Sequence, residues 1–524
     1  MNQNIIKITK TAENMTPVIY EVLASLDDSA ENVLEFEKGT YHFYREGSKN
    51  RMLYSSSRKA CAVDIIFDVI GKKNLTIDGN YSDFIFCDRV NPFYFLNCEN
   101  VTLKNINMEY AFLRYAYAEI VEVRDDGFLL NLDRNIFDYT ISKDKNLEFI
   151  CGKDVISTKH KKISVQSLTT DIRSIIYLYV GDNEARRNPA ARHINVDAVM
   201  QENNVFMKYR DDNENLLPFP ENSTICLAYD NEREAHACFC EQCKNVSVEN
   251  ISIYRNGGMG LVFDLCENVS INKYRLALKE GRREYFSSTA DGVFATNCSG
   301  DFSLVDSYIR DTYDDAINLH GYYLQVDRIL SDTEVKLKQG NASHNIIPFL
   351  KGDTVHISDE NMDFLKTATV KDIRFDENRV TNIIMTLDTT EGLAPAMLFE
   401  NRCRMPKVLI ENNTIINCPH MRLSAPNMII RNNNLNLTGG DIYINDLATF
   451  WQESGAVEDV LIIGNTFGES RNPNIVVSSY RPETSNQIHD RITVTENRFQ
   501  MSQDKAIKAK GVRKLILESN SFGE

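Results

Sequence analysis

The sequence lacks an excess of positive charge, a long apolar run and an N-terminal leader pattern. Its 524 residues include 58 Lys and Arg against 74 Asp and Glu, for a formal net charge of −16. This acidity argues against nucleic acid or an anionic membrane as a partner. No apolar run approaches the ~20 residues that span a bilayer, and the start MNQNIIKITKTAENMTP has no apolar h-region. We therefore expect a cytoplasmic protein as the chain stands, or a secreted or periplasmic one if its N terminus has been trimmed.

Residues spaced like metal ligands are also scarce, although the chain has 12 cysteines. ACFCEQCKN brings together Cys238, Cys240 and Cys243, but no second cluster or His pair with zinc-like spacing accompanies it. Cys243 also opens one copy of a repeated phrase, so its side chain should point into the core, where free cysteine packs as a small apolar residue. We expect no metal and no cofactor, and a reducing compartment would leave the thiols unpaired.

One short phrase does recur throughout the chain. CENVTLKNI starts at Cys98, CKNVSVENI at Cys243, CENVSINKY at Cys266 and the looser CSGDFSLVDS at Cys298. Copies without the cysteine follow: KVLIENNTI, NMIIRNNNL, DVLIIGNTF, RITVTENRF and KLILESNSF. Each contains a polar turn and a short alternating strand. Asn recurs because it tolerates the left-handed turn conformation and hydrogen-bonds nearby backbone.

The recurrence predicts a solenoid. Cys243 and Cys266 are 266 − 243 = 23 residues apart, the length of one turn of a coil whose units bury their apolar faces against one another. We therefore predict an all-β protein, a right-handed parallel β-helix. The alternative, an antiparallel β-sandwich, would show turn signals but no common phrase ending in Asn.

Two stretches interrupt the repeat. Residues 115–225 form a long polar region without repeat units, and 322–403 contain hairpin-like strands such as EVKLKQG and ATVKDIRF. We predict an N-terminal cap, with a helix in TAENMTPVIYEVLASL, and the first coils over 1–114. A β-rich insertion at 115–225, central coils at 226–321, an inserted antiparallel barrel-like domain at 322–403 and C-terminal coils at 404–524 should follow. The second insertion leaves directly after DDAINLHG, so it is placed to wall a binding cleft.

Carboxylates stand one coil apart in DGVFATNCSGDFSLVDSYIRDTYDDAINLHG. Asp291 precedes Asp314 by 314 − 291 = 23 residues and Asp315 by 315 − 291 = 24, which puts them on adjacent rungs ~4.8 Å apart. Crowded carboxylates repel, so one keeps a proton where an isolated Asp would not. A protonated acid beside an ionised base is what glycoside hydrolysis requires. Asp-Gly and Asp-Asp are also common turn dipeptides, so spacing alone leaves a structural role open.

Hydrogen-bonding side chains near these acids suit a sugar. Asn318 and His320 follow at alternating positions, and Arg404 and Arg422 are further candidates for binding sugar hydroxyls. The structural alternative for His320 is a hydrogen bond at a coil corner, and for either Arg a solvated position.

The only tryptophan, Trp451, is a candidate for stacking on sugar C–H groups. Glu453 lies two residues further on, so along a strand it would share the face of Trp451. The alternative is a core Trp beside a surface Glu.

ADGVFATNCSG followed by DDAINLHG resembles glycoside hydrolase family 110. The family motif is an Asp-Gly rung followed by an Asp-Asp-(Gly/Ala)-x-Asn-x-His-Gly rung. The sequence matches it position for position with Asp291, Asp314, Asp315, Asn318 and His320. WQESG, from Trp451, also looks like a family segment. The resemblance is strong over residues 286–321 and fair over residues 403–468, and in the rest of the chain it extends only to the expected architecture.

This resemblance implies an inverting exo-acting α-1,3-galactosidase on a β-helix that uses no metal. It implies Asp314 as the general acid and Asp291 and Asp315 as the residues that hold the attacking water. The expected partner is a galactose-terminated glycan, and homo-oligomer formation is left open.

Two rival functions remain. One is another β-helix carbohydrase, either a polygalacturonase-like hydrolase or a polysaccharide lyase; a lyase would want calcium and basic residues, and no Lys/Arg cluster flanks Asp314. The other is a non-catalytic glycan-binding β-helix, which gives no reason for the five motif residues to coincide.

Overall fold

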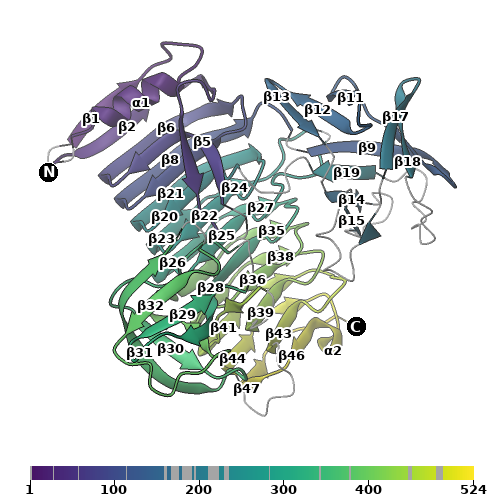
Figure 1. Cartoon of the computed structure of the whole chain (residues 1–524). Coiled ribbons are helices and arrows are strands. Elements are labelled where there is room, and N and C mark those ends of the chain that lie inside the picture. Colours follow the sequence, from purple (N-terminus) through teal and green to yellow (C-terminus); the bar gives the residue numbers. More distant parts are fainter. Residues whose placement is uncertain are drawn as a thin grey trace. The chain divides into compact units, whose positions relative to one another are not determined.

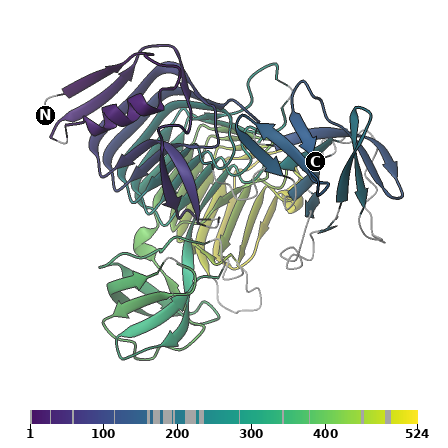
Figure 2. The same ribbon diagram turned by 45° about the horizontal axis from the view of Figure 1, so that its top comes forward.

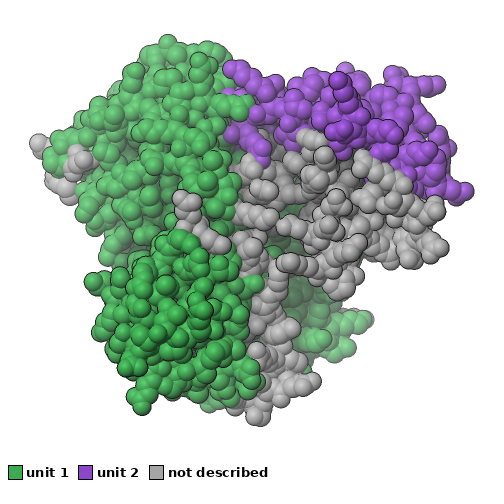
Figure 3. Space-filling view, viewed as in Figure 1, with its two compact units in different colours: residues 1–86, 90–109, 234–524 green, residues 87–89, 110–233 purple. Residues whose placement is uncertain are grey.

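The structure, a computed structural model, describes most of the chain as two compact units. Unit 1 comprises residues 1–86, 90–109 and 234–524, and unit 2 comprises 87–89 and 110–233 (Figure 3). The described residues are 3–27, 29–56, 58, 60–113, 115–157, 162–166, 176–179, 192–193, 196–209, 224–228, 235–282, 284–340, 344–376, 379–446, 451–479 and 488–523. The remainder of the predicted 115–225 insertion lies outside these residues.

Unit 1 is mainly a parallel β-helix, as the recurring phrase predicts (Figure 1). Each copy of the phrase supplies one strand, because its alternating apolar residues face inward and its polar residues outward. These strands pair in parallel in the order β8 (Glu99–Tyr110), β21 (Lys244–Arg255), β23 (Glu267–Asn272), β26 (Ser299–Val305), β34 (Lys407–Glu411), β37 (Asn427–Arg431), β41 (Asp459–Ile463), β44 (His489–Thr495) and β47 (Val512–Glu518).

Short strands extend each turn beside this sheet. They are β24 (Arg275–Leu276), β27 (Tyr308–Arg310), β35 (Thr414–Ile416), β38 (Asn434–Asn436), β42 (Thr466–Phe467) and β45 (Arg498–Phe499).

The other long parallel sheet carries the acidic motif. Its strands are β5 (Cys61–Ile70), β7 (Asn91–Leu96), β20 (Cys238–Glu241), β22 (Leu261–Asp264), β25 (Val293–Thr296), β28 (Ile317–Ile329), β36 (Met421–Leu423), β39 (Ile442–Asp446), β43 (Ile475–Ser479) and β46 (Ile507–Ala509). Val293 pairs with Ile317 and Ile317 with Met421. The turn is therefore 317 − 293 = 24 residues at the motif, and the next spacing is 421 − 317 = 104 residues because the second insertion intervenes.

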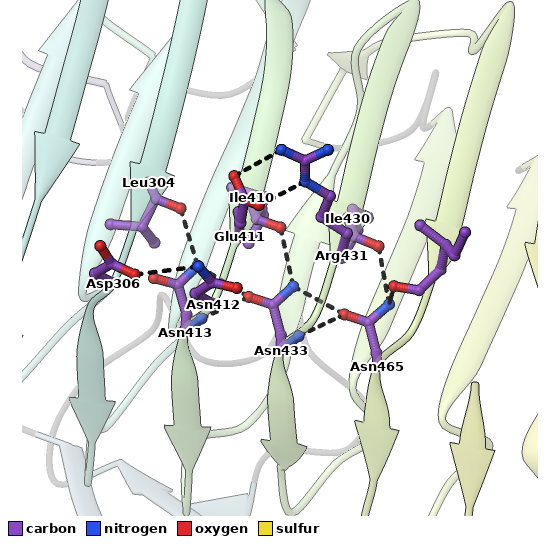
Figure 4. A network of polar contacts seen from close by, with 11 residues as sticks. Leu304, Asp306, Ile410, Glu411, Asn412, Asn413, Ile430, Arg431, Asn433 and Asn465 are labelled. Atoms are coloured by element: carbon purple, nitrogen blue, oxygen red, sulfur yellow. Dashed lines mark hydrogen bonds and ion pairs between the residues drawn. The ribbon is translucent and has the colours of Figure 1, made fainter. Parts of the chain in front are cut away.

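Asn side chains hold the turns together in the way the sequence predicts (Figure 4). Asn412 adopts the left-handed conformation with φ 56°, and the next residue, Asn413, is buried. The Asn413 side-chain amide donates to Leu304 O at 2.9 Å and to Asn433 Oδ1 at 3.0 Å. Asn433 donates in turn to Asn465 Oδ1 at 2.9 Å. Each amide thus satisfies the backbone of one turn and links it to the next.

Cysteines form a similar stack inside the first coils. The strand registers place Cys98, Cys243, Cys266 and Cys298 on successive turns, and each is no more than 2% exposed. The inward position predicted for Cys243 is therefore confirmed.

The second insertion is a closed antiparallel barrel within unit 1. Beyond the solenoid β28 continues into it and pairs with β29 and β33, and the ring closes through β32, β31 and β30. These strands are β29 (Glu334–Lys338), β30 (Thr354–Ser358), β31 (Phe364–Phe375), β32 (Ile383–Leu387) and β33 (Leu398–Glu400), drawn in green in Figure 2. Leu324, Val335, Ile357 and Phe399 are among its fully buried core residues. The predicted fold class, a β-helix with a barrel-like insertion, is confirmed.

The N-terminal segment holds the predicted helix and opening coils. Helix α1 (Thr16–Ala24) buries Ile19 and Leu23. The strands are β1 (Gln3–Ile8), β2 (Glu31–Phe36), β3 (Thr40–Phe43), β4 (Lys49–Leu53) and β6 (Lys73–Phe86). The short helices η2 (Arg402–Arg404) and α2 (Gln503–Ala506) lie further along the chain. No helix among the described residues is long and apolar enough to cross a membrane.

Unit 2 is also β-rich. One sheet has eight strands, β9 (Tyr115–Arg124), β10 (Gly127–Asn131), β14 (Lys162–Gln166), β15 (Ile176–Tyr179), β16 (Arg192–His193), β17 (Val196–Gln201), β18 (Asn204–Tyr209) and β19 (Thr224–Ala228). A second sheet comprises β11 (Asp138–Ile141), β12 (Leu147–Cys151) and β13 (Asp154–Ser157). Phe128, Leu130 and Phe149 lie in its core.

Candidate active site

The acidic motif occupies two neighbouring turns of the β-helix. Asp291 stands two residues before Val293, and Asp315 two residues before Ile317, with which Val293 pairs. Gly292 N donates to Asp315 O at 2.9 Å. A Cβ on Gly292 would lie 2.6 Å from Ala316 O, so only glycine lets the turns approach this closely. Adjacent turns therefore bring Asp291 and Asp315 together, as the 24-residue spacing predicts.

The three carboxylates differ in exposure. Asp291 is 1% exposed and Asp315 4%, whereas Asp314 lies in the bend and is only partly buried. Asp314 is thus the most accessible of the three acids, and the other two are buried.

His420 contacts Asp315 and was not identified from the sequence. Its Nε2 lies 2.9 Å from Asp315 Oδ1. It immediately precedes β36, and Ala316 N donates to His420 O at 2.8 Å, which fixes it beside the motif. The coil period could not reveal this neighbour, because the barrel separates it from Asp315 along the chain.

Arg422 links two carboxylates of the site. Its Nε lies 3.7 Å from Asp315 Oδ2 and 3.6 Å from Glu453 Oε2. Burial alone would lower the pKa of Arg422, but the nearby charges of Glu453 and Asp315, and of Asp314 and Asp291, outweigh it and raise that pKa. The guanidinium is therefore a fixed cation within the acidic cluster, rather than the solvated Arg of the alternative reading.

The Asn445 amide also contacts this cation. In the orientation that satisfies both of its polar atoms, Asn445 Oδ1 accepts from Arg422 Nη1 at 2.8 Å.

His320 and Glu453 face each other across two antiparallel strands. Strand β40 (Glu453–Ser454) pairs with β28, and His320 Nε2 lies 3.7 Å from Glu453 Oε1. His320 Nδ1 is 2.9 Å from Gly321 O, which can only accept, so Nδ1 carries the proton. Burial lowers the pKa of His320 although Glu453 opposes it. The imidazole is therefore neutral, with Nε2 as its bare nitrogen.

Aromatic rings connect His320 to the exposed tryptophan. The ring of Tyr322 lies 4.8 Å from that of His320 and 4.3 Å from that of His344, and His344 lies 6.2 Å from Trp451. Burial lowers the pKa of His344 to about 3, so it too is neutral. Trp451 is 45% exposed. The sequence did not identify Tyr322 or His344.

One expectation about Trp451 was wrong. It does not lie on a strand with Glu453, because Gln452 has φ 47° and β40 begins only at Glu453. Glu453 is buried while Trp451 is exposed, the reverse of a core Trp beside a surface Glu.

Arg404 is held by a different acid. Its Nε and Nη2 donate to Asp353 Oδ2 at 2.8 Å and Oδ1 at 3.3 Å. Asn401 donates to the same carboxylate. The structure thus places Arg404, the last residue of η2, in a bidentate ion pair with Asp353, and its role toward a sugar stays a prediction.

Several buried polar atoms around the site have no hydrogen-bond partner among the described residues. They include Asn318 Oδ1 and His344 Nε2. Buried polar atoms in proteins are normally hydrogen-bonded, so orphaned ones beside a cluster of acids suit a polar ligand.

Metal-binding groups are not assembled here. Within the described ranges no group of three or more His, Cys, Asp or Glu side chains could hold a metal ion. Burial raises the pKa of Cys240, which disfavours the thiolate that zinc requires.

Two curated proteins that match this chain over most of its length are α-1,3-galactosidases. Alpha-1,3-galactosidase B of Bacteroides thetaiotaomicron is 25% identical over 97% of this chain and 83% of its own length. Alpha-1,3-galactosidase B of Phocaeicola vulgatus is 26% identical over 98% of this chain and 90% of its own. No protein-family model matches the chain. Among solved structures, polygalacturonase from Erwinia carotovora ssp. carotovora aligns over 98% of this chain and 92% of its own, with 9% identity and a TM-score of 0.39. The chain is thus similar over nearly its whole length to bacterial α-1,3-galactosidases, which confirms the resemblance predicted from residues 286–321.

Proposed function

We propose that this protein is an inverting, exo-acting glycoside hydrolase that releases terminal α-1,3-linked galactose from glycans. The observation that carries the proposal is the meeting of Asp291, Asp314 and Asp315 on adjacent turns. The similarity to α-1,3-galactosidases along the whole chain gives this acid cluster its substrate class.

The three acids divide the chemistry between them. Asp314, the most accessible, donates a proton to the departing glycosidic oxygen as the C–O bond breaks. Asp291 and Asp315 hold a water on the opposite side and take its proton as its oxygen attacks the anomeric carbon. An inverting enzyme needs room for this water, with acid and base ~6.5–9.5 Å apart. The starting states return when the base releases to solvent the proton that it took from the water and Asp314 takes up a proton from solvent, so the net reaction consumes one water molecule.

The surrounding side chains bind the sugar. Arg422 and Asn318 offer a donor and an acceptor beside Asp315, and Glu453 and bare Nε2 of neutral His320 accept from hydroxyl groups. The exposed face of Trp451 stacks on sugar C–H groups. Trp451→Ala should therefore raise KM about fivefold with a smaller change in kcat, because stacking on a sugar contributes about 1 kcal/mol.

An assay on α-1,3-galactobiose and on nitrophenyl α- and β-glycosides tests the function. We expect galactose release from the α-1,3-linked substrate without added metal. Proton NMR of the first product should show β-galactose, since inversion converts an α-linkage into a β-product. Initial α-galactose would rule out this mechanism. Activity that disappeared on chelation and returned with calcium would instead favour the lyase.

A further inference from the structure

The outer face of the sheet that carries the acidic motif continues in both directions from the site. Side chains paired in register on parallel strands point to the same side of a sheet, so one row of them runs along this face. The members of this outer row, from the first coils to the last, are Phe239, Val262, Phe294, Asn318, Arg422, Tyr443, Val476 and Lys508. Asn318 and Arg422 belong to the site, so a glycan that extends along the sheet must follow the outer row toward one end.

The end of the outer row before the site is closed. Phe239, Val262 and Phe294 are fully buried, because the hairpin of β4 and β5 packs Leu53 and Val63 in one apolar cluster with them. A sugar inserted here would leave its hydroxyl groups without hydrogen-bond partners, which is costly.

This closure reaches the turn next to His320. Ser56, which follows β4, donates from Oγ to Asp264 Oδ1 at 3.0 Å and lies 3.1 Å from Thr296 Oγ1. Thr296 is the register partner of His320 and is fully buried. Residues 53–56 therefore form an end wall one turn before the acids.

The barrel contacts the same segment from its other side. The Arg379 guanidinium lies 3.8 Å from the ring centre of Tyr54, and the Asn345 side-chain amide donates to Arg58 O. The end wall is thus held both by the solenoid and by the barrel.

The opposite end of the outer row is accessible. Tyr443 and Val476 are partly exposed, and Lys508 is exposed. The Tyr443 ring lies 4.6 Å from that of His420, and its hydroxyl donates to Gly439 O at 2.9 Å, which fixes the ring. An aromatic ring and an apolar side chain suit the C–H groups of sugars, and an ammonium group donates to their hydroxyl groups.

We propose that the sugars on the aglycone side of the scissile bond lie over Tyr443, Val476 and Lys508, and that residues 53–56 stop the glycan beyond its terminal galactose. The closed end explains why the enzyme acts on chain ends. The inference rests on the proposed function for the position of the scissile bond, whereas binding to the outer row does not require catalysis.

A bulky side chain on the outer row tests the path of the aglycone. Val476→Trp should lower kcat/KM about tenfold on a tetrasaccharide that ends in α-1,3-linked galactose, because the indole occupies space that the aglycone sugars need. The loss should be much smaller on methyl α-galactoside, which has no sugar on that side. Equal losses on both substrates, or no loss on either, would overturn the proposal.

Two further variants separate obstruction from misfolding. Ile429→Trp adds the same bulk at an exposed position of β37, on the other parallel sheet, and should leave both rates and the melting temperature unchanged. Lys508→Ala removes an exposed side chain without introducing a clash. It should lower kcat/KM about threefold on the tetrasaccharide, as expected for one lost hydrogen bond, and less on methyl α-galactoside.

A capped glycan tests the end wall. An oligosaccharide whose terminal galactose carries one further sugar should resist cleavage, whereas its uncapped form is cleaved. Release of a disaccharide from the capped end would show that residues 53–56 do not stop the chain.

Calorimetry provides a readout without turnover. In an Asp314→Asn background, adding Val476→Trp should raise Kd for the tetrasaccharide about tenfold and change Kd for methyl α-galactoside far less. An unchanged Kd for the tetrasaccharide would refute the inference even if the unmodified enzyme is active. Conversely, weakened tetrasaccharide binding in a protein that cleaves no α-galactoside would support the inference and refute the proposed function.

Discussion

The C-terminal coils and the coils around residues 291–320 share one backbone design but differ in their buried polar residues. Both use left-handed Asn at the turns, with φ 56° at Asn432 and 47° at Asn297. In the C-terminal coils the residue after the turn is a neutral amide, which is buried at Asn413, Asn433, Asn465 and Asn497 and partly buried at Asn520. Each amide donates to the next, and each turn thereby repeats the environment of its neighbour.

In the central coils, charged and titratable residues gather instead at the start of strands of the other parallel sheet. Asp291 and Asp315 stack where repetition brings like charges together, and Asn318 Oδ1 has no hydrogen-bond partner among the described residues. Repetition stabilises a ladder of amides because each amide is both donor and acceptor. The same repetition destabilises a ladder of carboxylates, which can only accept when ionised. Residues that cost stability, such as like-charged carboxylates on adjacent turns, are expected at functional sites.

The largest effect should come from Asp314→Asn. We expect kcat on α-1,3-galactobiose to fall about 10³- to 10⁴-fold, because a general acid contributes on that order. An aryl galactoside with an activated leaving group should retain far more of its rate, since its departure needs little protonation. The melting temperature should not fall.

Asp301→Asn is the matched control for this variant, because Asp301 is an exposed carboxylate on the same coil. It should leave both rates unchanged. Equal losses on the two substrates in Asp314→Asn would argue that Asp314 is not the acid.

Breaking the amide ladder should act on stability alone. Asn465 Oδ1 accepts from Asn433 N and Nδ2, and Asn465 Nδ2 donates to Ile430 O at 2.8 Å. Asn465→Ala should lower the free energy of unfolding in urea by about 3 kcal/mol, because it leaves several buried groups unpaired. Asn434→Ala, at an exposed neighbouring position, should change it little. A small effect at Asn465 would show that the ladder does not stabilise the coils.

A buried acid in the C-terminal coils should make stability depend on pH. Burial raises the pKa of Asp441 from 3.8 to about 7, although Asn474 donates to its carboxylate. A raised pKa in the folded state means that this group stabilises the fold fully below about pH 4 and that the contribution is lost as pH rises through about 7. We expect Asp441→Asn to remove about 4 kcal/mol of the fall in unfolding free energy between pH 4 and pH 8.

Urea unfolding at several pH values measures this effect. Asp301→Asn again serves as the control and should keep the original slope. If the free energy of unfolding of Asp441→Asn depended on pH as in the unmodified protein, ionisation of Asp441 would not destabilise the fold.

The smallest effect should come from the cysteine stack. Cys243→Ala should lower the free energy of unfolding by about 1 kcal/mol through lost packing, whereas the exposed Cys403→Ala should have no effect. Elemental analysis of the unmodified protein should find no stoichiometric zinc. Zinc at one equivalent would mean that the thiols bind metal.

Much of the site could be predicted because its residues lie within one coil length. Asp291, Asp314, Asp315, Asn318 and His320 fall inside 30 consecutive positions, so spacing and a motif were sufficient to find them. Arg422 and Glu453 were named as single residues without a known partner, and His420 was missed. Their contacts with Asp315 and His320 cross the barrel insertion, whose length no repeat period encodes. Arg404 shows the opposite case, a plausible residue type that the structure pairs with Asp353.

The sequence by itself determined the β-helix, because each repeat carries its own turn residue and inward-facing strand and needs only its neighbours to fold. It also determined the acidic motif, since a coil of fixed length returns Asp315 to the position of Asp291. Only the tertiary structure decided which residues surround those acids. His420, Glu453 and Trp451 reach the site after a closed barrel has returned the chain to the solenoid. Such contacts depend on the path of the whole insertion, which local pattern does not specify.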